Sequence, residues 1–245
     1  MANLEELIED LIEKNADDFE ISKLIKEHIK AYLSSLNDLF VENQGKDFLV
    51  KHTRKIDHFI TIIYKYTLRK YFGHYMPFTN TIPIVLVGMG SYGREELCVY
   101  SDIDLMVVYK SVLGYNIEPL IQSMLYLAWD AGIKLGHRTH RVEELYEASN
   151  QDLSIKTAML ESRFLCGSKL LWMETERELL MIQKNDQKRV IMQILEAHQQ
   201  RREKYPLNME PNIKEGVGGL RDANTLSWIC KILFGSIRVR DLVPQ

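Results

Sequence analysis

Apolar residues recur at helical spacing through the first part of the chain. From Ile21 they fall at positions 21, 24, 25, 29, 32, 33 and 36, which share one face of a helix. A second stripe with the same spacing runs from Ile56 to Thr67, and the polar stretch 43–45 between the two stripes favours a break. The pattern therefore predicts an N-terminal helical segment over 1–78, with packing as its role.

The middle segment, 79–150, changes to short runs of β-branched residues. The runs 82–87 and 103–109 predict two strands with a buried face, and 134–142 predicts a third. Between the second and third runs, 116–131 shows a helical stripe, and Gly132 stands where a C-terminal capping glycine belongs. This order of strands and helices indicates an α/β unit.

The last segment, 151–245, returns to helical spacing. It predicts helices over 153–165, 186–202 and 220–234, the last preceded by the glycine-rich loop PNIKEGVGG. The chain ends in Val243-Pro244-Gln245 without a terminal element, which is typical of a fragment of a longer protein.

Composition and charge narrow the function classes. Apolar residues make up 46% and charged residues 27%, as in an ordinary soluble protein, and no apolar run is long enough to span a bilayer. The three cysteines, Cys98, Cys166 and Cys230, are far apart and lack metal-ligand spacing, so we expect a cytoplasmic location and no structural zinc. The net charge of −3 argues against nucleic acid as a specific partner.

Two acidic residues at the start of the second predicted strand are the first candidates for chemistry. Residues i and i+2 of a strand point to the same side, so Asp102 and Asp104 face one point. Carboxylates this close repel each other unless a divalent cation lies between them. Mg²⁺ prefers oxygen ligands, few from protein and the rest from water and phosphate. The pair therefore predicts a catalytic metal site for magnesium, with manganese as a substitute, facing a nucleoside triphosphate.

A glycine-rich turn, GMGSYGR at 88–94, precedes the acidic pair. Its glycines let backbone N–H groups approach a phosphate, Gly90 and Ser91 at the centre, and Arg94 adds a planar guanidinium. Each motif alone is weak, because surface aspartates two apart are common and glycine turns have many uses. Together, each attached to a hydrophobic strand, they predict a nucleotidyltransferase site. The alternative is a glycine turn beside solvated acids.

These motifs resemble the polymerase β nucleotidyltransferase superfamily, and more narrowly the N-terminal part of bacterial PII uridylyltransferases. The pattern G-x-G-S-x-G-R-x-E-L followed by S-D-I-D-L is shared with the superfamily, and DLSIKTAMLESRFLCG at 152–167 is similar to a second motif of the family. The stretch EPNIKEGVGGLRDANTLSWI at 210–229 is similar to a third, which is the most discriminating. The resemblance implies an α+β fold: N-terminal helices over 1–78, a nucleotidyltransferase core with a small mixed sheet over 79–150, and a C-terminal helical domain over 151–245 that completes the active-site cleft.

The resemblance also implies an activity: transfer of UMP from UTP to a tyrosine of a PII-type regulatory protein in nitrogen signalling. Asp102 and Asp104 match the family's metal-binding pair, and Gly90 and Ser91 match its phosphate-binding turn. Two alternatives stay open. One is a nucleotidyltransferase with another nucleotide or acceptor, such as adenylyl transfer, and the other is a catalytically silent nucleotide-binding module.

The chain departs from the family at 136–141, where the usual G-H-S-V-R-T reads GHRTHR. His140 stands at the place of the family arginine, with Arg138 and Arg141 beside it, and which arginine takes over is open. This strand also lacks the third carboxylate that superfamily enzymes often carry.

Three further residues are candidates by type and place. Glu161 and Asp222 are candidates for the third metal ligand or the base, and the alternative for each is a structural salt bridge, for example Glu161 with a neighbouring arginine. Lys214, among the glycines of the loop before the last helix, is a candidate for phosphate binding, and the alternative is a solvated lysine.

Overall fold

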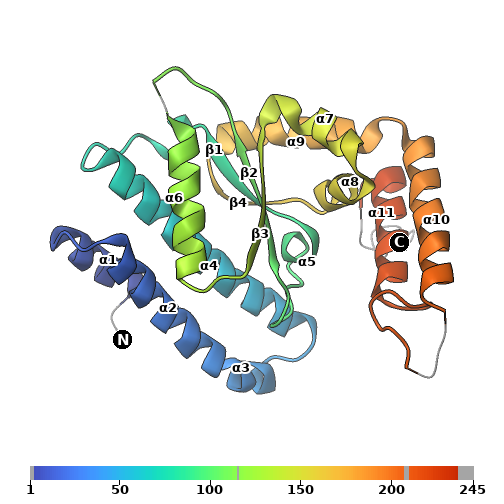
Figure 1. The fold of residues 1–245 in the computed structure, drawn as a ribbon, viewed down its shortest axis with the longest axis horizontal. Helices are drawn as coiled ribbons and strands as arrows, with labels where there is room; N and C mark the ends of the chain where they lie inside the picture. The colour runs from blue at the N-terminus through green and yellow to red at the C-terminus, as the bar shows by residue number, and fades with distance from the viewer. Residues whose placement is uncertain (1–2, 115, 207–209, 237–245) are drawn as a thin grey trace, which may run out of the picture. The chain divides into compact units, whose positions relative to one another are not determined.

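The computed structural model describes residues 3–114, 116–206 and 210–236, and these residues form an α+β protein (Figure 1). Within them, eleven α-helices accompany a four-stranded mixed sheet. The predicted fold class is therefore confirmed. The chain divides into two compact units, Met1–Val142 with Glu161–Glu174, and Glu143–Leu160 with Thr175–Gln245.

The first unit contains the sheet and the N-terminal helices. Its elements are α1 (Leu4–Glu13), α2 (Asp18–Ser34), α3 (Leu36–Glu42), α4 (Lys46–Phe72), the 3₁₀ turn η1 (Thr79–Thr81), β1 (Ile84–Gly88), α5 (Gly90–Gly93), β2 (Ile103–Tyr109), α6 (Ile117–Asp130), β3 (Leu135–Arg141) and β4 (Arg163–Gly167). The second unit is helical, with α7 (Leu145–Gln151), α8 (Leu153–Leu160), α10 (Gln187–Lys204) and α11 (Leu220–Phe234). Helix α9 (Lys169–Lys184) begins in the first unit and continues in the second, and the turn η2 (Val142–Glu144) lies at their border.

The sheet has the strand order β3-β2-β1-β4. Strand β1 is antiparallel to both β2 and β4, whereas β2 and β3 are parallel. The register pairs Gly88 with Leu105 and Asp104 with Gly136. The first residues of β2 therefore lie between the end of β1 on one side and the start of β3 on the other.

Helices cover one face of the sheet. The main hydrophobic core joins residues of α1, α2, α4 and α6 to Leu86 of β1 and to Ile103, Leu105 and Val107 of β2, and Figure 1 shows α2, α4 and α6 gathered beside the strands. Because successive strand residues point to opposite faces, Asp104 belongs to the other face. We call this other face, which carries Asp104 and its same-side neighbours on β1 and β3, the acid face. The predicted N-terminal segment thus packs as part of the sheet unit.

The structure corrects the predicted helix over 153–165. Helix α8 ends at Leu160, and the chain then forms β4, whose Phe164 pairs with Val87 and whose Gly167 pairs with Val85 of β1. Backbone N–H and C=O groups on the free edge of β1 need partners, and this long-range pairing outweighed the helical spacing of the apolar residues. Residues 161–174, which the sequence assigned to a helical domain, therefore lie with the sheet.

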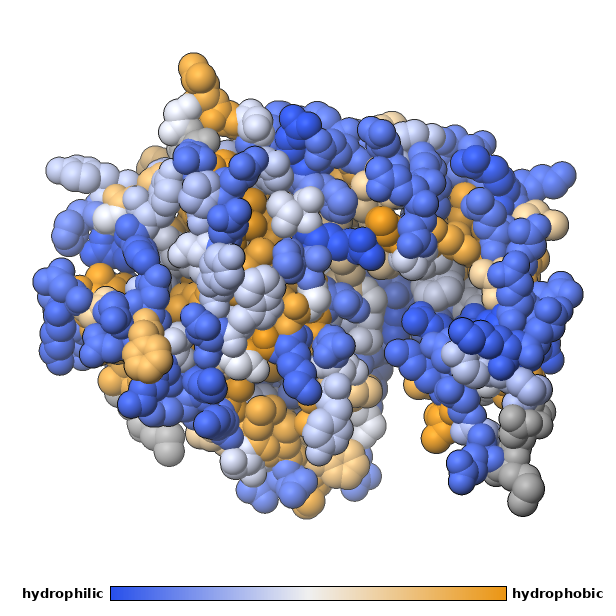
Figure 2. All heavy atoms as spheres, in the orientation of Figure 1, coloured by the Kyte–Doolittle hydropathy of each residue, from blue (hydrophilic) through white to orange (hydrophobic). Residues whose placement is uncertain are grey.

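The visible face of the molecule is mostly polar. Figure 2 shows hydrophilic side chains over most of the visible face, with hydrophobic ones in separate small patches. Among the described residues, no helix combines the length and the apolar character that crossing a bilayer requires.

Candidate active site

The acidic pair lies at the beginning of β2. Asp102 directly precedes the strand and Asp104 is its second residue, and both are exposed. Their neighbours Ile103 and Leu105 are buried in the helix-covered core, with 5% and 1% of their surface exposed. The alternation of exposed Asp104 with buried Ile103 and Leu105 is the pattern that the sequence predicted for the strand, and it puts the Asp104 carboxylate on the acid face.

Two glycines flank the carboxylate of Asp104. A Cβ atom added to Gly90 would lie 3.2 Å from Oδ2 of Asp104, and one added to Gly136 would lie 3.3 Å from Oδ1. The Met89 N–H also donates a hydrogen bond of 2.9 Å to the Asp104 carbonyl oxygen. Gly90 has a φ of +58°, a conformation that glycine adopts without strain. The glycine turn and the acid therefore belong to one site, and any larger side chain at either glycine would crowd the carboxylate.

The glycine turn is anchored from behind by buried groups. A Cβ atom on Gly93 would lie 1.9 Å from the carbonyl oxygen of Glu161, so only glycine permits this close approach. Tyr92 is fully buried, and its carbonyl oxygen accepts a hydrogen bond of 3.2 Å from Arg163 Nη2. Arg163 in turn makes two hydrogen bonds, of 2.9 and 3.0 Å, to the carboxylate of Asp57 on α4. Helix α4 and strand β4 together hold the turn in place.

Arg94 is the last residue of the turn, and its guanidinium forms ion pairs with two carboxylates. Its Nη1 lies 2.6 Å from Oε1 of Glu161, and its Nε lies 2.9 Å from Oε2 of Glu96. The side chain of Glu161 is 3% exposed and that of Arg94 is 16% exposed. Burial lowers the pKa of the Arg94 guanidinium, but the two carboxylates raise it further, so its pKa lies above the usual value. Glu161 is thus engaged in an ion pair, the kind of contact that the structural alternative expected, although its partner Arg94 lies in a distant part of the chain and both residues are in turns.

No third acid completes the pair in the described part of the chain. Among those residues, no group of three or more His, Cys, Asp or Glu side chains is arranged to hold a metal ion. The protein thus offers Asp102 and Asp104 as exposed carboxylates, and Glu161, within the same unit, is directed to Arg94 instead.

Strand β3 divides its polar residues between the two faces of the sheet. Gly136, Arg138 and His140 pair with Asp104, Met106 and Val108, so they share the acid face. The intervening His137, Thr139 and Arg141 share the helix-covered face with Leu105, Val107 and Tyr109. The ring of His137 indeed lies 5.4 Å from the ring of Trp129 on α6. His137 and His140 therefore lie on opposite faces of the sheet.

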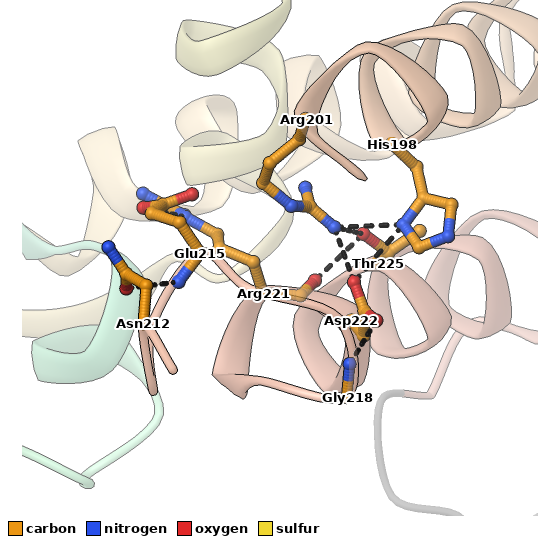
Figure 3. Close-up of polar contacts among 8 residues, drawn as sticks. All are labelled: His198, Arg201, Asn212, Glu215, Gly218, Arg221, Asp222 and Thr225. Atoms are coloured by element: carbon orange, nitrogen blue, oxygen red, sulfur yellow. Dashed lines mark hydrogen bonds and ion pairs between the residues drawn. The ribbon is translucent and has the colours of Figure 1, made fainter. Parts of the chain in front are cut away.

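In the second unit, Asp222 joins the glycine-rich loop to two helices (Figure 3). Its Oδ1 accepts a hydrogen bond of 2.7 Å from Arg201 Nη2 and lies 3.2 Å from His198 Nδ1, and its Oδ2 accepts one of 2.9 Å from the Gly218 N–H. The Gly218 hydrogen bond, followed by Arg201 and His198, lowers the pKa of the Asp222 carboxyl below its usual value. This is the structural salt bridge that the sequence left open as an alternative.

Lys214 lies on the surface of the same loop. The side chain of Asn212 accepts hydrogen bonds from the Lys214 N–H and the Glu215 N–H, of 3.1 and 2.8 Å, and Figure 3 shows the second of these. A Cβ atom on Gly219 would lie 2.6 Å from the Ile213 carbonyl oxygen, so the glycine makes a compact turn possible. The loop is ordered through its backbone, which leaves the Lys214 side chain exposed to solvent.

Sequence reasoning missed the residues that support the site. Asp57, Glu96, Gly136 and Arg163 were not singled out, although Arg163 stands in the second family-like motif, E-x-R, together with Glu161. That shared motif was the one signal that could have linked Arg163 to the glycine turn. Nothing in the local pattern around Asp57 could have done so, because its contact with Arg163 spans 106 positions of the chain.

The family model and the relatives that match this chain all carry the name of one kind of bacterial enzyme. Residues 189–245 match the family model described as GlnD PII-uridylyltransferase. The "Bifunctional uridylyltransferase/uridylyl-removing enzyme" of Rhodospirillum rubrum is 33% identical over 224 residues, which cover 83% of this chain and 22% of that protein. The proteins of the same name from Vibrio vulnificus and Ruegeria pomeroyi are 31% and 36% identical, over 86% and 66% of this chain. The chain spans only 25% and 18% of the length of these two relatives.

Proposed function

Because the chain is homologous over most of its length to bacterial bifunctional uridylyltransferase/uridylyl-removing enzymes, we propose that it is a nucleotidyltransferase that moves UMP from UTP to a protein acceptor. The acceptor in this proposal is a tyrosine hydroxyl of a PII-type regulator. The observation that carries it is the close approach of the Gly90 turn to the Asp104 carboxylate, because a phosphate cradle and a metal-binding acid must meet in one site.

Asp102 and Asp104 are the residues that would hold the Mg²⁺ ion of the triphosphate. Both are exposed, and glycine at positions 90 and 136 avoids Cβ atoms that would lie 3.2 and 3.3 Å from the Asp104 carboxylate oxygens. Magnesium characteristically takes one or two protein carboxylates and completes its coordination with water and phosphate, so this donor set fits it, and Mn²⁺ accepts the same oxygen ligands. When bound, the ion neutralises charge on the phosphates.

The chain's own residues position the reactants. The Gly90-Ser91 turn presents backbone N–H groups and a hydroxyl to the phosphates, and Arg94 with Glu161 holds the turn rigid. The acceptor oxygen forms a bond to the α-phosphorus while the bond from that phosphorus to the bridging oxygen breaks. Pyrophosphate leaves and the hydroxyl proton is released. Positioning and electrostatic stabilisation dominate such reactions.

Lys214 keeps its proposed role in phosphate binding. Its side chain is exposed, whereas that of Arg94 forms ion pairs with two carboxylates. Lys214 also lies in the region that the family model matches. A Lys214→Ala variant tests the role directly, since the loop is ordered by Asn212 and by glycines that the substitution leaves in place.

The decisive experiment is incubation of the chain with PII, Mg²⁺ and each of the four triphosphates, followed by mass measurement of the acceptor. We expect a mass increase of one UMP, located on a tyrosine, from UTP only. Transfer from another triphosphate would assign a different nucleotidyltransferase, and transfer from none would reject the enzymatic proposal.

A catalytically silent nucleotide-binding module is the second candidate. The observation that favours it is the lack of a third acid beside Asp102 and Asp104 in the described part of the chain. Saturable UTP binding without release of pyrophosphate would support this candidate over the enzyme.

A further inference from the structure

Strand β3 carries two arginines three positions apart, and only one of them lies on the acid face. The register pairs Arg138 with Met106 and Arg141 with Tyr109. Met106 is two residues from Asp104, so it shares its face, whereas Tyr109 is five residues away and lies on the opposite face. The strand geometry thus separates two residues that the sequence left equivalent.

The packing of neighbouring side chains supports this assignment independently. The ring of His137, which shares the face of Arg141, packs at an angle of 62° against the ring of Trp129 of the covering helix α6. Leu105 and Val107, which pair with His137 and Thr139, belong to the core under the helices. Arg141 therefore lies on the helix-covered face of the sheet, whereas Arg138 lies on the acid face.

Arg138 is within reach of a phosphate held at Asp104. The two residues are one strand apart and two positions apart along the strand, so about 4.8 Å and about 6.6 Å combine to about 8 Å between their Cα atoms. An extended arginine side chain spans most of this gap. Its guanidinium offers a planar fork that matches two phosphate oxygens.

The charge of Arg138 is also available, unlike that of the other arginines near the turn. Arg94 is held by Glu161 and Glu96, and Arg163 by Asp57. Arg138 is exposed on the edge strand of the sheet, and within the described residues it makes no ion pair. A nucleoside triphosphate carries several negative charges, more than the divalent cation at Asp102 and Asp104 neutralises.

We propose that Arg138 binds the triphosphate oxygens beside Asp104, and that Arg141 has no part in this contact. The inference rests on the proposed function, because it assumes a triphosphate at the acidic pair. The ordinary alternative is that Arg138 is an edge-strand charge that discourages pairing with another sheet.

The test compares three variants of the full chain: Arg138→Ala, Arg141→Ala and, as a control for loss of one exposed positive charge, Lys30→Ala on α2. Equilibrium titration with a fluorescent UTP in the presence of Mg²⁺ gives the affinity, and UMP transfer to PII gives KM and kcat. We expect Arg138→Ala to weaken UTP binding and raise KM about ten- to hundredfold, as for loss of a charge-assisted hydrogen bond. Arg141→Ala and Lys30→Ala should stay within about twofold of the parent, on the scale of ordinary surface substitutions.

Two further measurements make the outcome specific. Arg138→Ala should weaken binding of UTP far more than binding of uridine, because the contact is to phosphate, and Arg138→Lys should recover part of the affinity. UTP affinity unchanged in Arg138→Ala, or equal losses in Arg138→Ala and Arg141→Ala, would overturn the inference. If the parent chain binds UTP but transfers nothing, the enzymatic proposal fails while the titration still decides the role of Arg138.

Discussion

The guanidinium of Arg94 lies 2.6 Å from the carboxylate of Glu161, and this ion pair joins the end of the glycine turn to the short segment between α8 and β4. Both residues were candidates for direct contact with substrate or metal. The structure directs each toward the other, and we propose that together they hold the turn in position beside the Asp104 carboxylate.

Replacing Glu161 should destabilise the protein, because it removes one partner of a buried ion pair. Glu161→Ala leaves Arg94 buried with one partner fewer, and we expect a loss of about 3–5 kcal/mol in the free energy of unfolding. Glu161→Gln keeps the shape and should lose less, about 1–3 kcal/mol, with reduced kcat. Urea unfolding and UMP transfer measure both.

The magnesium dependence of Glu161→Gln separates positioning from metal binding. We expect the Mg²⁺ concentration for half-maximal activity to stay at the value of the parent, because the carboxylate contacts Arg94. Glu27→Gln, an exposed glutamate on α2, serves as the control. A large increase in the required Mg²⁺ for Glu161→Gln alone would show that Glu161 is a metal ligand.

The acidic pair is predicted to be indispensable for transfer and dispensable for folding. Asp102→Asn and Asp104→Asn each remove a charge from an exposed carboxylate, so we expect an unchanged melting temperature and at least about a hundredfold loss of UMP transfer. Asp130→Asn, an exposed aspartate at the end of α6, should keep full activity. Near-normal transfer by either variant of the pair would contradict the proposed mechanism.

Gly90 offers a test with a matched control elsewhere in the same unit. Gly90→Ala forces alanine into a φ of +58° and places a Cβ atom 3.2 Å from Asp104 Oδ2, whereas Gly45→Ala meets a φ of +60° with no atom within 4 Å. Both should lose stability from the positive φ, on the order of 1–3 kcal/mol, and Gly45→Ala should lose at least as much as Gly90→Ala because the ψ of Gly45 is −128°, outside the left-handed region. Only Gly90→Ala should lose UMP transfer, which a comparison of unfolding curves and activity will show. Equal activity losses in the two variants would point to stability rather than crowding of Asp104.

The ion pair of Asp222 should make the free energy of unfolding depend on pH. Its pKa is lowered in the folded state, so the stabilisation is present above the unfolded value of about 3.9 and is lost as the pH falls through the folded value. Asp222→Asn should therefore be less stable than the parent by about 1–3 kcal/mol at pH 7, and this difference should shrink below pH 4. Urea unfolding at both pH values tests it, with the exposed Asp38→Asn as control. A difference that is the same at both pH values would exclude the carboxylate charge as its cause.

The sequence alone determined the elements whose pattern is local. The period of two residues along 103–109 placed Asp104 on one side and Ile103 and Leu105 in the core, and the structure has β2 over Ile103–Tyr109 with Asp104 exposed and the other two buried. The stripe over 220–234 likewise predicted α11, which spans Leu220–Phe234. Such features depend on a few consecutive residues, so the sequence contains all the information that they need.

Only the tertiary structure decided which distant residues meet. The pairing of β4 with β1, the Arg94–Glu161 ion pair and the place of Gly136 beside Asp104 each join residues far apart in the chain. The parallel register of β2 and β3 also separated Arg138 from Arg141. A shift of one residue in the register of a strand moves every side chain to the opposite face, and packing across the whole sheet sets that register. The local sequence therefore could not decide which of the two arginines lies on the acid face.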